Sequence, residues 1–580
     1  MLPGRSCGKA LPVSAALTTG RRSSRLFSFA NAAILLCCAM LALTAFPLLA
    51  SVTRLLDGAS SNEVVSGLGG ASFRIVMLNT ALVVLTSAAI AVTTACVLAW
   101  IDERTDGNLP GFGRMMALAP LLVPPVAGVM GWAVLLDPNA GLLNGLLRQA
   151  FAPFGITFGR GPLNVYTATS MVLMTSLYLV PYAYLIIAAA LRQLDPGLEE
   201  ASRLNRAGPF RTMWKVTLPS IAPSIGSAAM LTVISGLGLF SVPFIIGTTA
   251  RLDVVSVYVF RLLDQYPPRP ALALAVAALL FLLVQGLLAI QRHMAARRRH
   301  AAVGGRGARS ARVRLGVLRP FARGLAIFYI LATAVLPLAA LFLVSLQPFW
   351  SGNINWSVLS FDNYRVALFQ SGPTSRALFN SVSLAALTAT SAMLCVGTIM
   401  LYAAMFNRRL EKIADFATAL PATIPHTVVG VCFILAFSGG LFNLYGSPVL
   451  LFLAYLVMAL PFAGRAASSA ATAIGKDLAE ASRTFGAGEG RTFRRIMMPL
   501  ALPGLAAGWA IIFIHTAGEV TASALLAGSR TPVIGRVLMD LWNYGSFPQV
   551  AALALIIAAM NAIVVGLVLR FADRGMVAGG

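Results

Sequence analysis

Long apolar runs separated by short polar segments dominate this chain. Twelve runs of about 20 residues begin near residues 27, 75, 114, 167, 224, 271, 324, 378, 414, 447, 501 and 549. A helix of that length crosses the hydrocarbon core of a bilayer and pairs its own backbone groups there. The pattern predicts an all-α polytopic membrane protein with about 12 transmembrane helices.

The composition agrees with a membrane location. The 580 residues are 58% hydrophobic and 11% charged, whereas soluble domains carry about 25% charged residues. The net charge of +24 would favour nucleic-acid binding in a soluble protein. Here the basic residues lie between the apolar runs, where they orient helices and meet anionic lipid. We therefore expect membrane lipid, and no nucleic acid, among the partners.

Basic residues gather in alternate loops. If the N-terminus is cytoplasmic, the inside loops hold Arg104 and Arg114, Arg192 to Lys215, Arg292 to Arg323, Arg408 to Lys412, Arg465 to Arg495, and Arg570 with Arg574. The outside loops offset their arginines with acids such as Asp57, Glu63, Asp253 and Asp264. This distribution predicts that both termini are cytoplasmic. The run from Leu26 to Val52 is too long for a cleavable signal and is expected to remain as the first helix.

The two halves of the chain repeat one another. At a constant offset of 280, Glu200, Ala201, Ser202, Arg203, Ala207, Pro219 and Pro223 recur as Glu480, Ala481, Ser482, Arg483, Ala487, Pro499 and Pro503. At an offset of 301, Asn79, Pro120 and Pro124 recur as Asn380, Pro421 and Pro425. The change of offset indicates a longer loop in the first half. Each half is thus predicted to be one six-helix unit, and the two units have the same membrane orientation.

The repeat sets the expected domain boundaries. They are a cytoplasmic tail over 1–25, a first transmembrane domain over 26–291, a linker over 292–323 and a second transmembrane domain over 324–572. The linker has no acidic residue and is rich in Gly, Ala and Arg. This composition predicts a flexible cytoplasmic connection, with a polybasic lipid contact as the alternative.

Each copy of the longer repeat falls in a predicted cytoplasmic loop between the fourth and fifth helices of its half. It opens with a short helix. In the first copy Asp195 can cap this helix and Pro196 suits its first turn, and in the second copy Asp477 stands three residues before Glu480 in a box-like start. Its apolar face is formed by Leu198, Ala201 and Leu204 in the first copy, and by Leu478, Ala481 and Phe485 in the second. Such a helix can dock into a groove of a partner. One copy alone would be read as a plain surface helix, but two matched copies suit a two-fold partner.

The pattern Glu-Ala-Ala, with Gly six and Pro nineteen residues after the Glu, resembles the EAA loop of binding-protein-dependent ATP-binding-cassette (ABC) importer permeases. The second copy has Glu480, Ala481, Gly486, Ala487 and Pro499, and the first has Glu200, Ala201, Ala207 and Pro219. Ser202 and Ser482 replace the second alanine. Arg206 replaces the glycine, which favours an asymmetric or more rigid turn in the first loop.

The resemblance implies a transport subunit of the bacterial inner membrane. Each loop would insert into one subunit of a cytoplasmic ATPase dimer, and a soluble binding protein would deliver the solute from outside. No GxxxxGK[ST] phosphate-binding loop occurs, and the nearest glycine cluster has Arg491 in place of the lysine. The chain is therefore expected to be no enzyme, with no cofactor of its own and ATP bound by the partner.

The fused pair of units most resembles the ferric-iron permease group, with thiamine, phosphonate and polyamine permeases as alternatives. A secondary transporter with 6+6 repeats is a further alternative. It would carry a Gly/Asp/Arg-rich motif between the second and third helices, where this chain reads IDERTDGNLPGFGR.

Polar residues inside membrane runs are candidates for the translocation path. They are His426, His515, Glu519, Asn79 and Asn380. His515 and Glu519 are four residues apart and could pair on one helix face. The alternative is a buried pair that fixes helix packing. The first half has Leu239 opposite Glu519, so the site would be one-sided.

Two further features complete the expectations. The prolines at 120, 124, 125, 421 and 425 should interrupt the third and ninth helices, as a gate or as an entry point near the interface. Six cysteines occur without metal-ligand spacing, so neither a disulfide nor a metal site is expected.

Overall fold

The computed structural model describes residues 29–56, 61–109, 120, 123–297, 312–370, 372–439, 442–475 and 477–577. The predicted tail over 1–25, the predicted start of the third helix with Arg114, and the linker centre over 298–311 lie outside these residues. In the described ranges, β1 (Ser438–Gly439) and β2 (Phe442–Asn443) are the only strands, paired as a small hairpin. The predicted all-α fold is confirmed.

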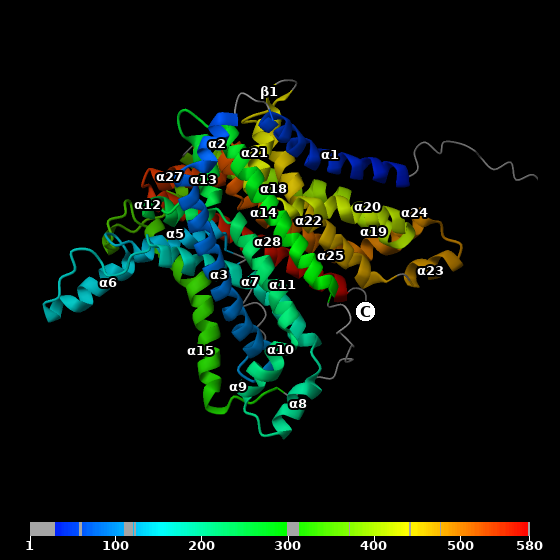
Figure 1. The fold of residues 1–580 in the computed structure, drawn as a ribbon, viewed down its shortest axis with the longest axis horizontal. Coiled ribbons are helices and arrows are strands. Elements are labelled where there is room, and N and C mark those ends of the chain that lie inside the picture. Colours follow the sequence, from blue (N-terminus) through cyan, green and yellow to red (C-terminus); the bar gives the residue numbers. More distant parts are fainter. Residues whose placement is uncertain are drawn as a thin grey trace, which may run out of the picture.

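The helices of the first half follow the order of the predicted runs (Figure 1). They are α1 (Phe29–Leu56), α2 (Ser61–Gly69), α3 (Ala71–Arg104), α5 (Pro125–Leu136), α6 (Leu142–Phe151), α7 (Ala168–Gln193), α8 (Pro196–Leu204), α9 (Pro209–Thr212), α10 (Leu218–Ser220), α11 (Ala222–Gly238), α12 (Thr248–Ala250), α13 (Val255–Asp264) and α14 (Pro270–Arg297).

The second half repeats this order of spans. Its helices are α15 (Arg319–Ile330), α16 (Leu336–Ser345), α17 (Asp362–Arg365), α18 (Gly372–Ala392), α19 (Thr398–Phe406), α20 (Arg408–Ala419), α21 (His426–Phe437), α22 (Pro448–Ile474), α23 (Asp477–Thr484), α24 (Glu489–Thr492), α25 (Met498–Ala517), α26 (Thr521–Leu526), α27 (Ile534–Asn543) and α28 (Phe547–Val577).

Nine helices in the described ranges are long and apolar enough to cross a membrane, and up to 12 if each of three bent pairs is one span. Pro425 caps the start of α21, after a bend of 98°. The proline positions therefore break the ninth helix as predicted. One bent pair was missed: Pro243–Ala250 and Val255–Asp264 meet at 77° in a stretch expected to be an outside loop. Its apolar runs are too short to signal a span.

The first helix of each half packs against the opposite half. Helix α1 lies on α20, α21 and α22, while α16 lies on α5. Between α15 and α16, the carbonyl of Ala332 accepts a hydrogen bond of 2.9 Å from Nε1 of Trp132 in α5. The hydroxyl of Tyr329 donates to the carbonyl of Leu177 in α7 at 3.3 Å. This reciprocal exchange joins the two repeats into one body.

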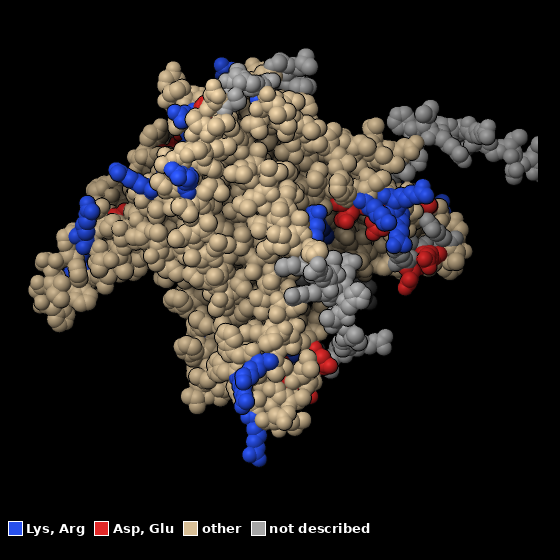
Figure 2. Space-filling view, in the orientation of Figure 1, with Lys and Arg blue, Asp and Glu red and all other residues tan. Residues whose placement is uncertain are grey.

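The two halves diverge from a shared core. Figure 1 shows α3, α7 and α11 of the first half, with α15, running down toward α8, and helices of the second half, with α1, running right toward α23. Figure 2 shows charged side chains mainly toward the outer ends and a broad uncharged middle. Large apolar residues such as Leu78, Leu82 and Leu85 on α3 are exposed there. An uncharged belt of this kind suits contact with lipid tails.

The longer loop predicted in the first half is found between α5 and α7. There, 31 residues separate the two helices, against 10 between α21 and α22. The difference of 21 equals the change of offset from 301 to 280. The extra residues form α6 and the segment after it.

A close approach between the halves gives a test of this packing. A Cβ on Gly131 in α5 would lie 2.4 Å from the backbone oxygen of Pro337 in α16. We expect Gly131→Val to lower the free energy of unfolding by about 1–3 kcal/mol, because the added side chain would displace the backbone of α16. Thermal unfolding in detergent measures this. Gly324→Ala, in open space on α15, is the control and should not destabilise; equal melting of both variants would contradict the packing.

Candidate functional site

The two loop helices predicted to dock, α8 and α23, occupy the diverging ends of their halves (Figure 1). Their apolar sides face outward. Leu204 is 86% exposed and Phe485 is 92% exposed, and Leu198 and Leu478 are also exposed. Each copy therefore exposes an apolar residue at its tip. Glu200 and Glu480 are exposed beside them.

The turn after each helix has the same backbone. Arg206 has φ 58° and Gly486 has φ 77°. The next amide, of Ala207 or Ala487, donates to the carbonyl of Ser202 or Ser482 at 3.2 or 3.1 Å. The expectation of an asymmetric turn is therefore wrong for the backbone. Arg206 adopts the left-handed conformation that glycine takes in the second copy, at a cost of about 1–2 kcal/mol.

The serine in each copy has a structural explanation. Oγ of Ser202 lies 3.0 Å from Oγ1 of Thr212, and Oγ of Ser482 lies 2.8 Å from Oγ1 of Thr492. Each bond ties the loop helix to the short helix that follows it, α9 or α24. An alanine could not form this bond. Pro219 in α10 and Pro499 in α25 then lead the chain into the fifth helix of each half.

A buried charge network holds the first loop only. Arg104, the last residue of α3, lies 3.5 Å from the carboxylate of Glu199, and both side chains are buried. The same guanidinium donates to the carbonyls of Leu191 and Leu194 at the end of α7, at 2.5 and 2.8 Å. Oγ1 of Thr217 donates to Glu199 at 2.8 Å. One arginine thus connects α3, α7, α8 and the entry to α11.

The second loop lacks these groups. At the matching offsets it has Met405 for Arg104, Ala479 for Glu199 and Met497 for Thr217. Instead, the hydroxyl of Tyr402 donates to the carboxylate of Glu489 in α24 at 3.0 Å, at the surface. The sequence analysis missed the buried network because Arg104 and Glu199 are 95 residues apart and only the fold brings them together.

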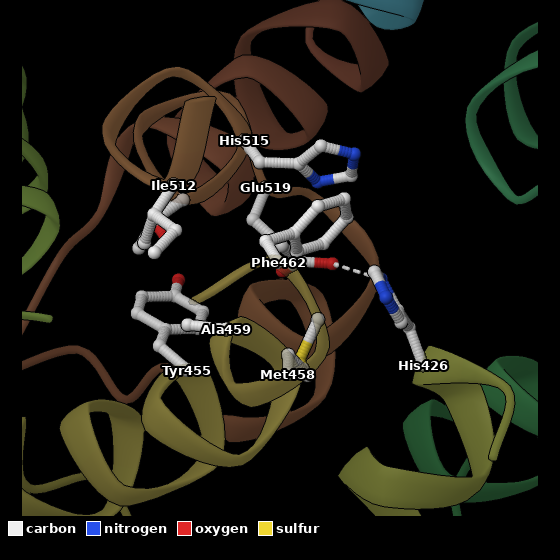
Figure 3. A pocket seen from close by; sticks show the side chains of 9 residues that line it. His426, Tyr455, Met458, Ala459, Phe462, Ile512, His515 and Glu519 are labelled. Atoms are coloured by element: carbon white, nitrogen blue, oxygen red, sulfur yellow. Dashed lines mark ion pairs between the residues drawn. The ribbon is translucent and has the colours of Figure 1, made fainter. Parts of the chain in front are cut away.

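Three of the predicted polar path residues, all in the second half, line one pocket (Figure 3). It contains His426 from α21, Tyr455 and Phe462 from α22, and His515 and Glu519 from the end of α25. The ring of His515 lies on Phe462, with centroids 4.7 Å apart. Leu239 remains the first-half residue opposite Glu519, so the pocket is one-sided in its chemistry.

Glu519 does not pair with His515 along one helix, because α25 ends at Ala517. The predicted shared helix face is wrong, although both residues line the same pocket. Nδ1 of His426 is instead 3.7 Å from the carboxylate of Glu519. The carboxylate also accepts the amides of Ala522, at 2.9 Å, and Ser523, at 3.0 Å. It therefore caps α26 at a break inside the membrane body, in addition to lining the pocket.

Asn79 and Asn380 lie away from this pocket and make equivalent contacts. The side-chain amide of Asn79 donates to the carbonyl of Asp253 at 3.3 Å, and that of Asn380 to Pro532 at 2.9 Å. The neighbouring hydroxyls of Thr80 and Ser381 accept the amides that begin α13 and α27. These residues fasten a broken segment in each half.

No group of three or more His, Cys, Asp and Glu side chains is placed to hold a metal ion within the described ranges.

The comparison with known families addresses the predicted resemblance directly. The family model of the binding-protein-dependent transport system inner membrane component matches residues 111–300 and 393–576, one stretch in each half. The chain belongs to this family. The predicted fused two-unit arrangement is confirmed, and the secondary-transporter alternative has no support.

Relatives of this permease chain include two ferric transport proteins. The ferric transport system permease protein FbpB of Actinobacillus pleuropneumoniae is 24% identical over 460 residues, which cover 78% of this chain and 64% of the relative. The putative ferric transport system permease protein FbpB 1 of Haemophilus influenzae is 24% identical over 431 residues, covering 73% and 65%. The chain thus spans slightly less than two thirds of each. The probable ABC transporter permease protein y4fN of Sinorhizobium fredii is 28% identical over 460 residues, covering 77% and 78%.

The buried network predicts a strong coupling between two residues. Arg104→Met removes the guanidinium from the buried carboxylate of Glu199, and should lower the free energy of unfolding by about 3–5 kcal/mol. The double variant with Glu199→Leu should recover most of that loss. Thermal unfolding measures both. Arg269→Met, which breaks the exposed pair with Glu63, is the control and should cost under about 1 kcal/mol. Additive losses in the double variant would disprove the network.

The capping contacts of Glu519 give a second test. Glu519→Ala leaves the amides of Ala522 and Ser523 without their acceptor, so we expect a loss of about 1–3 kcal/mol in unfolding free energy. Glu519→Gln keeps one oxygen acceptor and should lose less. Melting temperatures in detergent decide the order. Wild-type stability of the alanine variant would show that Glu519 is no cap.

Proposed function

We propose that this chain is the membrane-spanning permease subunit of an ABC importer. The outward apolar tips of α8 and α23 carry the proposal, because they present two equivalent docking elements at the ends of two homologous halves. A two-fold symmetric ATPase dimer offers two equivalent grooves for them. ATP is bound and hydrolysed by that partner, and this chain needs no cofactor.

Coupling follows from how the loop helices are joined to the membrane body. When the ATPase subunits close, they draw α8 and α23 together. Because the halves diverge toward these helices (Figure 1), the same movement closes the space between them and changes which side of the membrane the solute can reach. Arg104 transmits force from α8 to α3 and α7.

The proposed orientation places α8, α23 and both termini in the cytoplasm of a bacterial cell, with the chain in its inner membrane. The distribution of Lys and Arg between the predicted loops supports it. The family name, an inner membrane component, also supports it. A soluble binding protein then delivers the solute on the opposite side.

We propose ferric iron as the solute. The names of the two FbpB relatives support it. Thiamine, phosphonates and polyamines are the competing solutes. Uptake of radioactive iron by reconstituted vesicles, with each competitor in excess, distinguishes them. Iron uptake that no competitor inhibits supports iron as the solute. Absence of iron uptake, or its inhibition by a competitor, would overturn this assignment.

The docking tips provide the decisive experiment on coupling. We expect Leu204→Ser and Phe485→Ser each to weaken association with the partner ABC ATPase by at least about 30-fold, as for buried interface anchors. Co-purification and ATPase stimulation in nanodiscs measure the loss.

The matched control is Phe361→Ser, an exposed apolar residue on the loop between α16 and α18, which should bind normally. Full ATPase binding by both tip variants, or uptake driven by an ion gradient without any ATPase, would overturn the proposal.

A further inference from the structure

The first half carries an arm that the second half lacks. We define the arm as residues 142–163, made of α6, the turn Ala152–Phe154 and the segment after it. It contains most of the 31 residues between α5 and α7, where the second half has a hairpin of 10. Figure 1 shows α6 reaching sideways, away from the helical body.

The base of the arm is firmly held. The amide group of Asn144, which is fully buried, donates to the carbonyls of Asp137 and Leu163 at 2.8 and 2.7 Å. Its oxygen accepts the backbone amide of Leu163 at 3.1 Å. The guanidinium of Arg148 donates to the carbonyls of Pro138 and Asn139. The arm is therefore an ordered projection with a fixed direction.

The far part of the arm is apolar and bare. At 100° per residue, Leu143, Leu146, Leu147, Ala150 and Phe151 share one side of α6. Arg148 lies on the other side, and Asn144 lies at the edge, next to Phe151. Leu146 and Phe154 are 61% and 76% exposed, and Ile156 is also exposed. The ring of Phe151 contacts those of Phe154 and Phe158. Leu143 and Leu147, nearer the body, are half-buried, whereas Leu146, Ala150 and Phe151 are exposed.

The charge of the arm has a single sign. Its only charged residues are Arg148 and Arg160, and no acid lies between positions 138 and 194. Figure 2 shows blue side chains on the projecting arm. The arm also begins where α5 ends and stops just before α7 begins, and α7 is long and apolar enough to span the membrane. The arm leaves the body at the level where a membrane helix ends.

We propose that the arm lies in the headgroup layer of the outer leaflet, with its apolar side in the acyl region and its arginines on anionic phosphates. Leucine and phenylalanine on one side of a helix and arginine on the other are the pattern of an interfacial helix. Aromatic residues favour that layer, and anionic lipid attracts arginine. An arm held there fixes the depth of α5 and α7. The assignment to the outer leaflet rests on the proposed orientation of the chain.

The experiment uses the full-length chain in nanodiscs, with the six native cysteines replaced. An environment-sensitive nitrobenzoxadiazole label is placed at Ala150→Cys on the apolar side, and at Gln149→Cys as the control, turned by 100° toward the polar side. Phe154→Cys is a second probe that does not depend on α6. Quenching by lipids with a nitroxide near the headgroup, and the shift of label emission, are measured.

We expect blue-shifted emission and strong quenching at 150 and 154, and neither at 149. Replacing Arg148 and Arg160 with Gln should weaken quenching in phosphatidylglycerol and leave it unchanged in phosphatidylcholine. An equal effect in both lipids would overturn the role of headgroup charge. Labels at 150 and 154 that stay open to water in both lipids would overturn the proposal. Shielding only after a soluble protein is added would identify a protein-docking arm instead. None of these readouts depends on an ATPase or on iron.

Discussion

Backbone groups exposed by a broken membrane helix must find partners inside the protein, because hydrocarbon offers none. This constraint explains the polar residues of the membrane body. Asn79 with Thr80, and Asn380 with Ser381, bind the backbone around the starts of α13 and α27. Glu519 performs the same task for α26 with a charged group. At these positions, polar side chains that would suggest a substrate path bind the backbone of broken helices.

The internal repeat separates what the two halves share from what each half adds. The left-handed turn, the serine–threonine bond after each loop helix and the asparagine contacts occur twice. The buried network of Arg104, the polar pocket around Glu519 and the lateral arm occur once. The two loop helices therefore match, while the membrane body to which they are joined is asymmetric. A buried charge pair ties α8 to the bundle, and surface and apolar contacts tie α23 to it.

Much of the fold was accessible from the sequence, for clear reasons. Apolar runs of membrane length mark helices whatever their neighbours are, and the repeat at a constant offset marks two units. The prolines before α21 predicted the break in the ninth helix. The bent pair of short helices around Asp253 was not predicted, because each helix lacks both the length of a span and the polarity of a loop. The shared helix face predicted for His515 and Glu519 was wrong, because α25 ends two residues before Glu519.

The sequence alone determined the helical class, the two six-helix units, the two loop helices and the extra length in the first half, because local periodicity and repeated motifs carry this information. Only the tertiary structure decided that α1 and α16 exchange places, that Arg104 meets Glu199, that Glu519 turns to His426 and that the apolar side of the arm is left uncovered. Each of these contacts joins residues of different elements, and a distance in space has no signature in the order of residues.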